Sequence, residues 1–269
     1  MPFETPRETR PFAPAIAKAT REKRMPPWFA DPCCGHFSND PSLSNAQIAT
    51  LAAWANAHAP LGNPRDAPAP VLWTTGWNIP SPDVVLKMPE AKRLPASGDV
   101  PYQYVIVPTG FSEDRWIQMA EIRPSNRMAV HHAVAYIRDS HSTWLRGAPV
   151  GKAFSANDLP TPELRRDAMW TTSDILLVYA PGSLPDRWDA GFAKLLPAGS
   201  DIVLQMHYTT HGLEMQDRTS IGLVFAKRAP EKRVLTLQLT NDRFVIPPGD
   251  PDTQACRSDE SPPHRSASV

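Results

Sequence analysis

Cysteine is scarce in this chain of 269 residues, and neither charge sign is in excess. Of the three cysteines, Cys33 and Cys34 are adjacent and Cys256 lies far from them, a set that cannot form a closed disulfide framework. Lysine plus arginine equals aspartate plus glutamate, at 28 each. The chain therefore has no overall field to attract nucleic acid, and we expect no nucleic-acid partner.

Long apolar stretches are missing as well. No run approaches the roughly 18 residues that a membrane-spanning helix needs, so we expect no membrane segment. The opening residues MPFETPRETRPF contain no apolar segment, and we expect no signal peptide in this chain. These absences argue against membrane-spanning and nucleic-acid-binding proteins, while the compartment is left open.

Proline and tryptophan are abundant instead, at 31 and eight residues. Proline cannot donate a hydrogen bond to a helix or a sheet, so its frequency predicts short elements joined by rigid turns. Eight tryptophans, together with an ordinary hydrophobic fraction of 41%, indicate a packed core rather than a disordered chain.

The segment 1–58 is typical of a small helical unit. Its stretch AIAKATREKR combines alanine with charged helix formers, and two consecutive prolines end it. Ser44 and Gln47 have the spacing of a capping box at the start of a second helix. The proline-rich residues 59–72 follow, and their stiffness predicts a linker between domains.

Short β-rich runs alternate with turn residues over 73–250: DVVLKM, YQYVIV, RWIQMAEI, MAVHHAVAYI, DILLVYA, DIVLQMHY, SIGLVFA and RVLTLQL. Such spacing predicts a mainly β fold, an antiparallel β-sandwich of the jelly-roll kind, preceded by the small N-terminal helical segment. The excursion at 145–170 is long for a compact domain, and such loops are usually functional or carry some structure of their own. Residues 251–269 lack apolar patterning, which predicts a disordered tail.

Two adjacent histidines stand in the middle of one predicted strand, NRMAVHHAVAYI. Successive strand residues point to opposite faces, so the rings of His131 and His132 should diverge in a regular strand. A β-bulge or a strand end can instead aim both rings into one region. The pair is therefore either a coincidence or part of one site.

A third histidine lies in the predicted strand DIVLQMHY. Ile202, Leu204, Met206 and Tyr208 form a continuous apolar face that should point to the core, which leaves His207 on the more polar face. The remaining histidines show no spacing typical of a metal site: His36, His58, His141, His211 and His264.

Three imidazoles converging on one point form a ligand set that suits copper or zinc. Carboxylates flanking these strands are sparse, which disfavours Mg, Ca or Mn. Neutral nitrogens stabilise Cu(I) and still accept Cu(II), so such a site can cycle one electron, whereas zinc with an open position would activate water. The sequence therefore predicts a metal site at His131, His132 and His207, and it leaves copper and zinc open.

Four segments between residues 80 and 250 resemble, in order and spacing, the first catalytic domain of the copper type II, ascorbate-dependent monooxygenases. That family includes peptidylglycine α-hydroxylating monooxygenase and dopamine β-monooxygenase. The segments are VHHAVAYI, VYAPG, LQMHY and the stretch from Ser220 to the closing IPPG.

The resemblance implies that His131, His132 and His207 hold the family's electron-transfer copper, with ascorbate as the reductant. It further implies O2-dependent hydroxylation of a small-molecule or peptide substrate, an antiparallel β-sandwich, and an exported or periplasmic location. The substrate itself is not marked by any residue pattern in the chain.

Residues 10–64 are similar to the latter part of bacterial cytochrome c-like domains that precede such monooxygenase domains. This second resemblance implies that Met25 is a haem axial ligand. The chain has no CxxCH sequence, so covalent attachment of a c-type haem is not possible in it. We therefore expect Met25 to be a packing residue of a partial helical domain.

The family's second copper, which binds O2 and attacks the substrate, is held by a His-x-His pair and a methionine, and this sequence contains no His-x-His. We therefore expect a truncated or partnered monooxygenase domain that needs a second copper domain for hydroxylation. One alternative is a non-catalytic β-sandwich binding module with a vestigial metal site. Another is a zinc hydrolase with Glu121 or Asp139 as general base.

Overall fold

The computed structural model describes residues 3, 5–28, 37, 39–67, 69, 76–169, 171, 173–236, 244–250 and 253. The chain divides into two compact units, Met1–Trp73 and Thr74–Val269. The described part of the chain contains no helix with the length and apolar character that a membrane crossing requires. The predicted tail, 251–269, lies outside the described residues except for position 253.

The first unit is helical, with α1 (Pro6–Thr9), α2 (Ala13–Arg21) and α3 (Asn45–Asn56), and with short 3-10 turns at Arg10–Phe12 and Pro64–Asp66. The predicted capping box is confirmed at the start of α3. The backbone N–H of Ser44 donates to Oε1 of Gln47 at 2.8 Å, and the N–H of Gln47 donates to Oγ of Ser44 at 3.3 Å. These two bonds satisfy donors that the first turn of a helix otherwise leaves free.

The described residues of the first unit bury little apolar surface. Its buried apolar side chains, among the described residues, are those of Ala13, Ala17 and Ala59. The expectation that Met25 packs in a core is wrong, because its side chain is 54% exposed. It lies in the bend after α2.

The second unit is built from strands, which confirms the mainly β fold. They are β1 (Val84–Lys87), β2 (Lys92–Leu94), β3 (Gln103–Pro108), β4 (Arg115–Arg123), β5 (Val130–Arg138), β6 (Phe154–Ser155), β7 (Ile175–Tyr179), β8 (Asp186–Arg187), β9 (Phe192–Leu196), β10 (Asp201–Tyr208), β11 (Met215–Asp217), β12 (Ser220–Phe225) and β13 (Lys232–Arg233).

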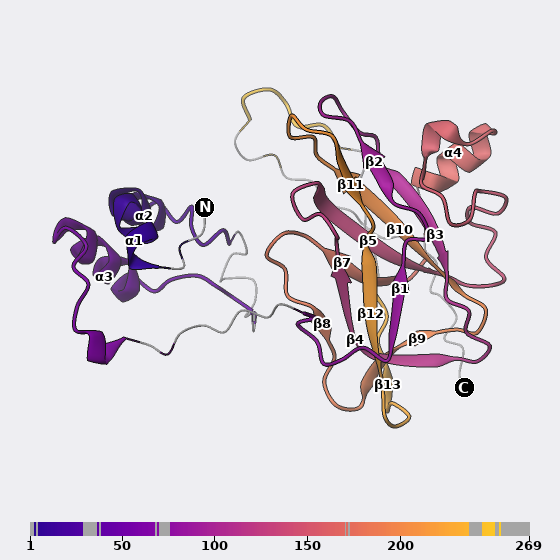
Figure 1. Ribbon diagram of the computed structural model, residues 1–269, viewed down its shortest axis with the longest axis horizontal. Coiled ribbons are helices and arrows are strands. Elements are labelled where there is room, and N and C mark those ends of the chain that lie inside the picture. Colours follow the sequence, from indigo (N-terminus) through magenta and orange to yellow (C-terminus); the bar gives the residue numbers. More distant parts are fainter. Residues whose placement is uncertain are drawn as a thin grey trace. The chain divides into compact units, whose positions relative to one another are not determined.

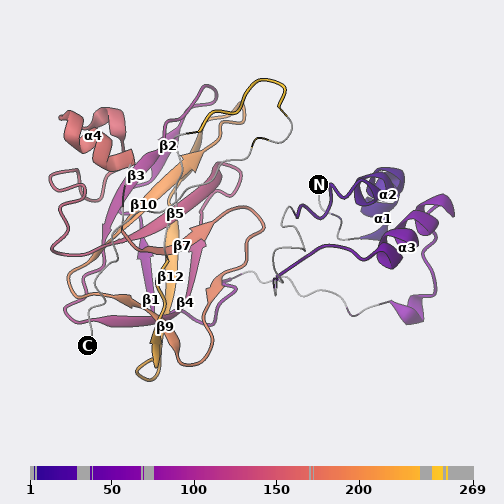
Figure 2. The same cartoon turned by 180° about the vertical axis from the view of Figure 1, so that it is seen from behind.

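Two sheets form the body of this unit. A six-stranded sheet has the order β1-β12-β4-β9-β13, with β8 paired to β4, and a five-stranded sheet has the order β6-β3-β10-β5-β7. In both views β3 and β10 run at an angle across β1 and β12, as strands of packed sheets do (Figures 1 and 2). The described strand pairs are antiparallel, except for β13 with β9.

The core lies between these two sheets. Ile117 and Leu223 of the six-stranded sheet belong to the same buried cluster as Leu204 and Met206 of β10. The alternation predicted for β10 is confirmed, because its even-numbered residues from Ile202 to Tyr208 all join that cluster. The odd-numbered residues of β10 therefore point to the outer face of the five-stranded sheet.

The long excursion at 145–170 carries structure of its own and covers part of that outer face. It contains β6, a 3-10 turn and α4 (Pro162–Met169), which lies beside β3 in both views (Figures 1 and 2). The ring of Phe154 stacks on Tyr104 of β3, with centroids 5.8 Å apart. A second buried cluster results, so the five-stranded sheet is packed on both faces along this part of its length.

Of the predicted strand RVLTLQL, residues 233–236 are described. Arg233 is in β13, together with Lys232 before it, whereas residues 234–236 are not in a strand. A buried ion pair gives the physical reason. Nζ of Lys194 lies 2.7 Å from Oδ1 of Asp174, and the same carboxylate oxygen accepts a hydrogen bond from the backbone N–H of Thr236 at 3.0 Å. The N–H of Thr236 therefore bonds to a side chain instead of a neighbouring strand.

Candidate metal centre

A β-bulge brings the two adjacent histidines to one face. His132 on β5 lies directly opposite His207 on β10, but the next pair is Val130 with Tyr208, so His131 has no partner across the ladder. An extra residue of this kind bends its strand and redirects its side chain. The bulge that the sequence allowed is thus confirmed, and it explains how two consecutive rings can lie at one site.

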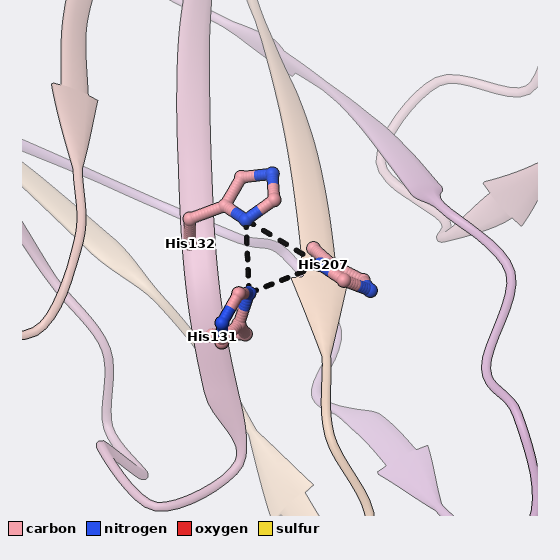
Figure 3. Close-up of side chains that lie close together, drawn as sticks. All are labelled: His131, His132 and His207. Carbon is pink, nitrogen blue, oxygen red and sulfur yellow. Dashed lines mark hydrogen bonds between the residues drawn. The ribbon is translucent and has the colours of Figure 1, made fainter. Parts of the chain in front are cut away.

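The three imidazoles point at a common centre through the same ring atom (Figure 3). Nδ1 of His131 lies 3.2 Å from Nδ1 of His132 and 3.2 Å from Nδ1 of His207. The third side of the triangle, between His132 and His207, is 3.4 Å. Among the described residues this is the group of histidine, cysteine and acidic side chains that can hold a metal ion.

These contacts have the length of hydrogen bonds, yet they cannot all be hydrogen bonds. A ring nitrogen of histidine either donates a proton or accepts one, so two members of any mutually contacting trio must share the same role. At least one contact would then join two lone pairs or two N–H groups. A cation at the centre removes this conflict, because it accepts all three lone pairs at once.

The size of the triangle fits a metal ion. Metal–nitrogen bonds of about 2.0–2.1 Å, as for zinc with imidazole, give ligand–ligand distances of roughly 3.3–3.4 Å in a tetrahedron. The observed Nδ1–Nδ1 distances of 3.2, 3.2 and 3.4 Å match one face of such a tetrahedron. Three protein ligands in this arrangement leave a fourth position for another ligand, which is the pattern of catalytic and redox sites.

The surroundings of two of the rings favour the neutral form that metal binding requires. Burial lowers the pKa of His132, and the neighbouring rings of His207 and His131 lower it further. Burial also lowers the pKa of His207, again with a contribution from His131. Because imidazolium has no lone pair on either nitrogen, a lowered pKa extends the pH range in which the ligand set is available.

Tyr102 contacts two of the three rings, although the sequence did not mark it. Its ring stacks on His207, with centroids 4.8 Å apart at 25°. Its hydroxyl lies 3.4 Å from Nε2 of His132. If the hydroxyl accepts the Nε2 proton, Nδ1 of His132 must carry the lone pair, and this is the tautomer that can bind a metal through Nδ1.

Asp217 supports both strands that carry the histidines. It is fully buried, and its Oδ2 accepts hydrogen bonds from the hydroxyls of Tyr208 at 3.2 Å and Thr219 at 2.6 Å. Its Oδ1 accepts from the N–H and hydroxyl of Ser125 and from the N–H of Asn126, at 2.9–3.1 Å. The side chain of Asp217 therefore joins Tyr208, the residue after His207, to the turn that leads into the bulge.

The two acidic residues considered as a general base are engaged elsewhere. The carboxylate of Glu121, on β4 in the other sheet, accepts three hydrogen bonds from Asn78 and Ile79 at 2.6–3.1 Å. Asp139 follows the far end of β5, roughly 23 Å along the strand from His132. Neither belongs to the group around the three imidazoles.

The other histidines do not join the cluster where they are described. His58, His141 and His211 lie outside it. Residues Cys33, Cys34, His36, Cys256 and His264 lie outside the described residues.

Comparison with known proteins does not assign this chain to a family. No model of a protein family matches this chain, and no curated protein matches it either. The evidence for a metal centre is therefore the geometry of the three histidines, and the resemblance to copper monooxygenases remains a prediction.

Proposed function

We propose that the second unit is a copper-binding domain of the ascorbate-dependent monooxygenase type, in which His131, His132 and His207 hold an electron-transfer copper. The observation that carries this proposal is the triangle of Nδ1 atoms, 3.2–3.4 Å on each side. A copper ion bound there would supply one electron at a time by cycling between Cu(II) and Cu(I). Ascorbate is the proposed reductant, and an organic small molecule or peptide is the proposed substrate.

The ligand set favours copper over a hydrolytic zinc. A zinc hydrolase needs a general base within reach of the metal-bound water. Glu121 is committed to Asn78 and Ile79, and Asp139 lies at the other end of β5. An all-imidazole set without a carboxylate base suits a metal that changes oxidation state.

The protein's own residues keep the ligand set ready. The hydroxyl of Tyr102 lies where it can accept the Nε2 proton of His132 and so favour the ligating tautomer, and its ring stacks on His207. The buried carboxylate of Asp217 restrains the turn before the bulge, so the three Nδ1 atoms keep their spacing. A rigid triangle of this kind costs little rearrangement on each change of charge, which favours electron transfer.

Hydroxylation requires an oxygen-activating centre in addition. The described residues contain a single three-ligand group, and its fourth position is the place for one further ligand. We therefore propose that this domain works with a second copper domain, which meets the substrate.

The non-catalytic alternative, a binding module with a vestigial site, is disfavoured by the same triangle. Converging nitrogens repel one another unless a cation or a proton lies between them, so a site without a metal would gain from letting the rings turn apart. The hydroxyl of Tyr102 beside His132 and its ring stacked on His207 instead favour the ligating arrangement.

Metal analysis tests the proposal. The protein is reconstituted anaerobically with Cu(I), freed of excess metal, oxidised and measured by mass spectrometry and EPR. We expect about one copper per chain and Cu(II) hyperfine splitting from nitrogen ligands only, and His132→Ala should lose both. His211→Ala is the matched control, because His211 lies outside the cluster and should leave copper binding unchanged.

Absence of copper after reconstitution, or equal copper in His132→Ala and the parent protein, would contradict the proposal. Preferential zinc binding with hydrolysis of a model ester would support the hydrolase instead.

A further inference from the structure

Lys194 extends its amino group into the interior of the second unit. Its side chain is 1% exposed, whereas a lysine is almost never fully buried unless it is paired. Ile117, opposite it on β4, and Leu196, two residues further along β9, both belong to the apolar cluster between the sheets. The metal centre does not involve this lysine, so its burial has a different cause.

The partner of Lys194 is a carboxyl group from the other sheet. Nζ of Lys194 lies 2.7 Å from Oδ1 of Asp174, the residue directly before β7. A C–O bond of about 1.2 Å then places the carboxyl carbon no more than about 3.9 Å from Nζ. This approaches the separation of about 3–3.5 Å at which groups fixed within one molecule react far faster than the same groups in solution.

The hydrogen bonds around this pair suit an amide better than an ion pair. Thr236 donates its backbone N–H to Oδ1 of Asp174 at 3.0 Å, and its Oγ1 accepts from Nζ of Lys194 at 2.9 Å. Oδ2 of Asp174 is buried and accepts a hydrogen bond from no described residue, which is costly for a carboxylate. An amide has one N–H and one carbonyl oxygen, and Thr236 offers a partner to each.

A second carboxyl group stands near the pair. Asp186 on β8 and Lys194 on β9 pair with the same edge of β4, opposite Ala120 and Ile117. Burial raises the pKa of Asp186, against a smaller lowering effect from the charge of Lys194. A carboxyl group that keeps its proton can act as a general acid beside a reacting amine and carboxyl group.

We propose that Lys194 and Asp174 form an intramolecular amide bond, and that Asp186 transfers the protons. One proton first passes from Nζ to the carboxylate, which leaves a neutral amine and a carboxylic acid and removes both charges from the interior. The lone pair of Nζ then attacks Cγ of Asp174, and the bond from Cγ to Oδ2 breaks.

The oxygen without a partner, Oδ2, leaves as water, with one proton from the acid and one from the amine. Asp186 donates a proton to this oxygen as the C–O bond breaks and regains one from Nζ. One N–C bond replaces one C–O bond, so the reaction consumes no oxidant, reductant or cofactor.

The bond would join the two sheets covalently. Lys194 lies in the six-stranded sheet and Asp174 precedes β7, an edge strand of the five-stranded sheet, so the cross-link closes the loop 174–194. The second unit contains one cysteine, Cys256, so a disulfide within the unit cannot join its sheets. An amide between residues 20 positions apart restricts the unfolded chain as a disulfide closing the same loop would.

Intact mass spectrometry of the denatured full chain tests the inference, and it requires no metal in the protein. We expect the parent protein to be lighter than its sequence mass by one water molecule. Lys194→Met and Asp174→Ala, which have the same termini, should show no loss of water. Lys152→Met is the matched control, because it changes an exposed lysine, and it should lose the water as the parent does.

Proteolysis followed by tandem mass spectrometry locates the bond, and we expect a branched peptide that joins Asp174 to Lys194. A folded parent protein with its full sequence mass would overturn the inference and leave only an ion pair. Loss of water within an unbranched peptide, as in succinimide formation, would overturn it as well.

A time course that starts at cell-free synthesis tests the role of Asp186. Asp186→Asn should form the branched peptide roughly a hundredfold more slowly than the parent, because the amide side chain cannot donate an acidic proton. Equal rates in the two proteins would overturn the assignment of proton transfer to Asp186. Circular dichroism shows whether the variant is folded.

Discussion

Nδ1 of His131 lies 3.2 Å from Nδ1 of His207, although 76 positions separate the two residues in the chain. The contact exists only because β5 and β10 pair in one register, with a bulge at His131. The metal centre is therefore a property of the folded strand pair, and a metal that binds it must stabilise that pair.

The first prediction concerns metal and stability. A metal that binds the folded state alone raises the free energy of unfolding by about 2.7 kcal/mol when its free concentration is 100 times its dissociation constant. We expect copper to raise the urea midpoint by a corresponding amount, and a chelator to reverse the shift. In His207→Ala the midpoint should not respond to copper, and a response equal to that of the parent protein would contradict a site at the triangle.

Tyr102 should control metal affinity more than stability. Tyr102→Ala removes both the stack on His207 and the partner of His132 Nε2, and the loss of such outer contacts typically costs about 10–100-fold in metal affinity. Tyr102→Phe keeps the stack and should cost less. Competition with a copper chelator measures the copper affinity of both variants. The control is Phe192→Ala, which changes a partly exposed aromatic residue in the other sheet.

If Tyr102→Ala and Phe192→Ala bind copper equally well, Tyr102 has no role in the centre. If Tyr102→Ala lost folding stability along with copper affinity, the cause would be lost packing. The exposure of this side chain, at 43%, argues against that outcome.

Asp217 should be among the most sensitive positions for folding. Asp217→Ala leaves five buried or half-buried donors without their acceptor, and we expect a loss of at least about 3 kcal/mol in the free energy of unfolding. Asp217→Asn keeps one acceptor oxygen and should lose less. Asp99→Ala, at an exposed site, should change stability by no more than about 0.5 kcal/mol in the same urea titrations.

Alkaline pH should destabilise the protein through Tyr208. Burial and the nearby Asp217 raise the pKa of Tyr208 above its ordinary value of 10.0. Below pH 10 the phenol is protonated in both folded and unfolded chains, so stability is unaffected. Above pH 10 only the unfolded chain releases this proton, and the free energy of unfolding falls as pH rises.

Urea titrations between pH 8 and pH 11 measure this effect, with pH values chosen around the ordinary tyrosine pKa. The parent protein should lose stability above pH 10 more steeply than Tyr208→Phe, by up to about 1.4 kcal/mol per pH unit. Identical slopes in the two proteins would show that Tyr208 ionises as easily in the folded chain as in the unfolded one.

Gly222 on β12 should not tolerate a side chain. A Cβ at this position would lie 2.9 Å from the ring of Trp77 and 2.9 Å from Cγ of Pro82. Gly222→Ala should therefore cost about 1–3 kcal/mol through overpacking. Gly76→Ala is the matched control, because a Cβ there meets no atom within 4 Å, and its thermal midpoint should stay within a few degrees of the parent value.

Part of the fold follows from local patterns. The alternation from Ile202 to Tyr208 indicates both the strand and its buried face, because side-chain direction along a strand depends on position alone. The capping box of Ser44 and Gln47 is likewise a contact between near neighbours. The short strands β2, β6, β8, β9 and β11 were not predicted, since their pairing partners, and not their own residues, keep them extended.

For the metal centre, the sequence by itself identified the three histidines as candidate ligands, the outward direction of His207 and a ligand chemistry of neutral nitrogens. Tertiary structure alone decided that the rings meet, that a bulge turns His131 toward its neighbours, and that Tyr102 and Asp217 support them. The reason is separation along the chain, because the bonds from Asp217 to Ser125 and Asn126 span 92 and 91 positions. Contacts of that kind depend on strand register, which no local pattern of residues contains.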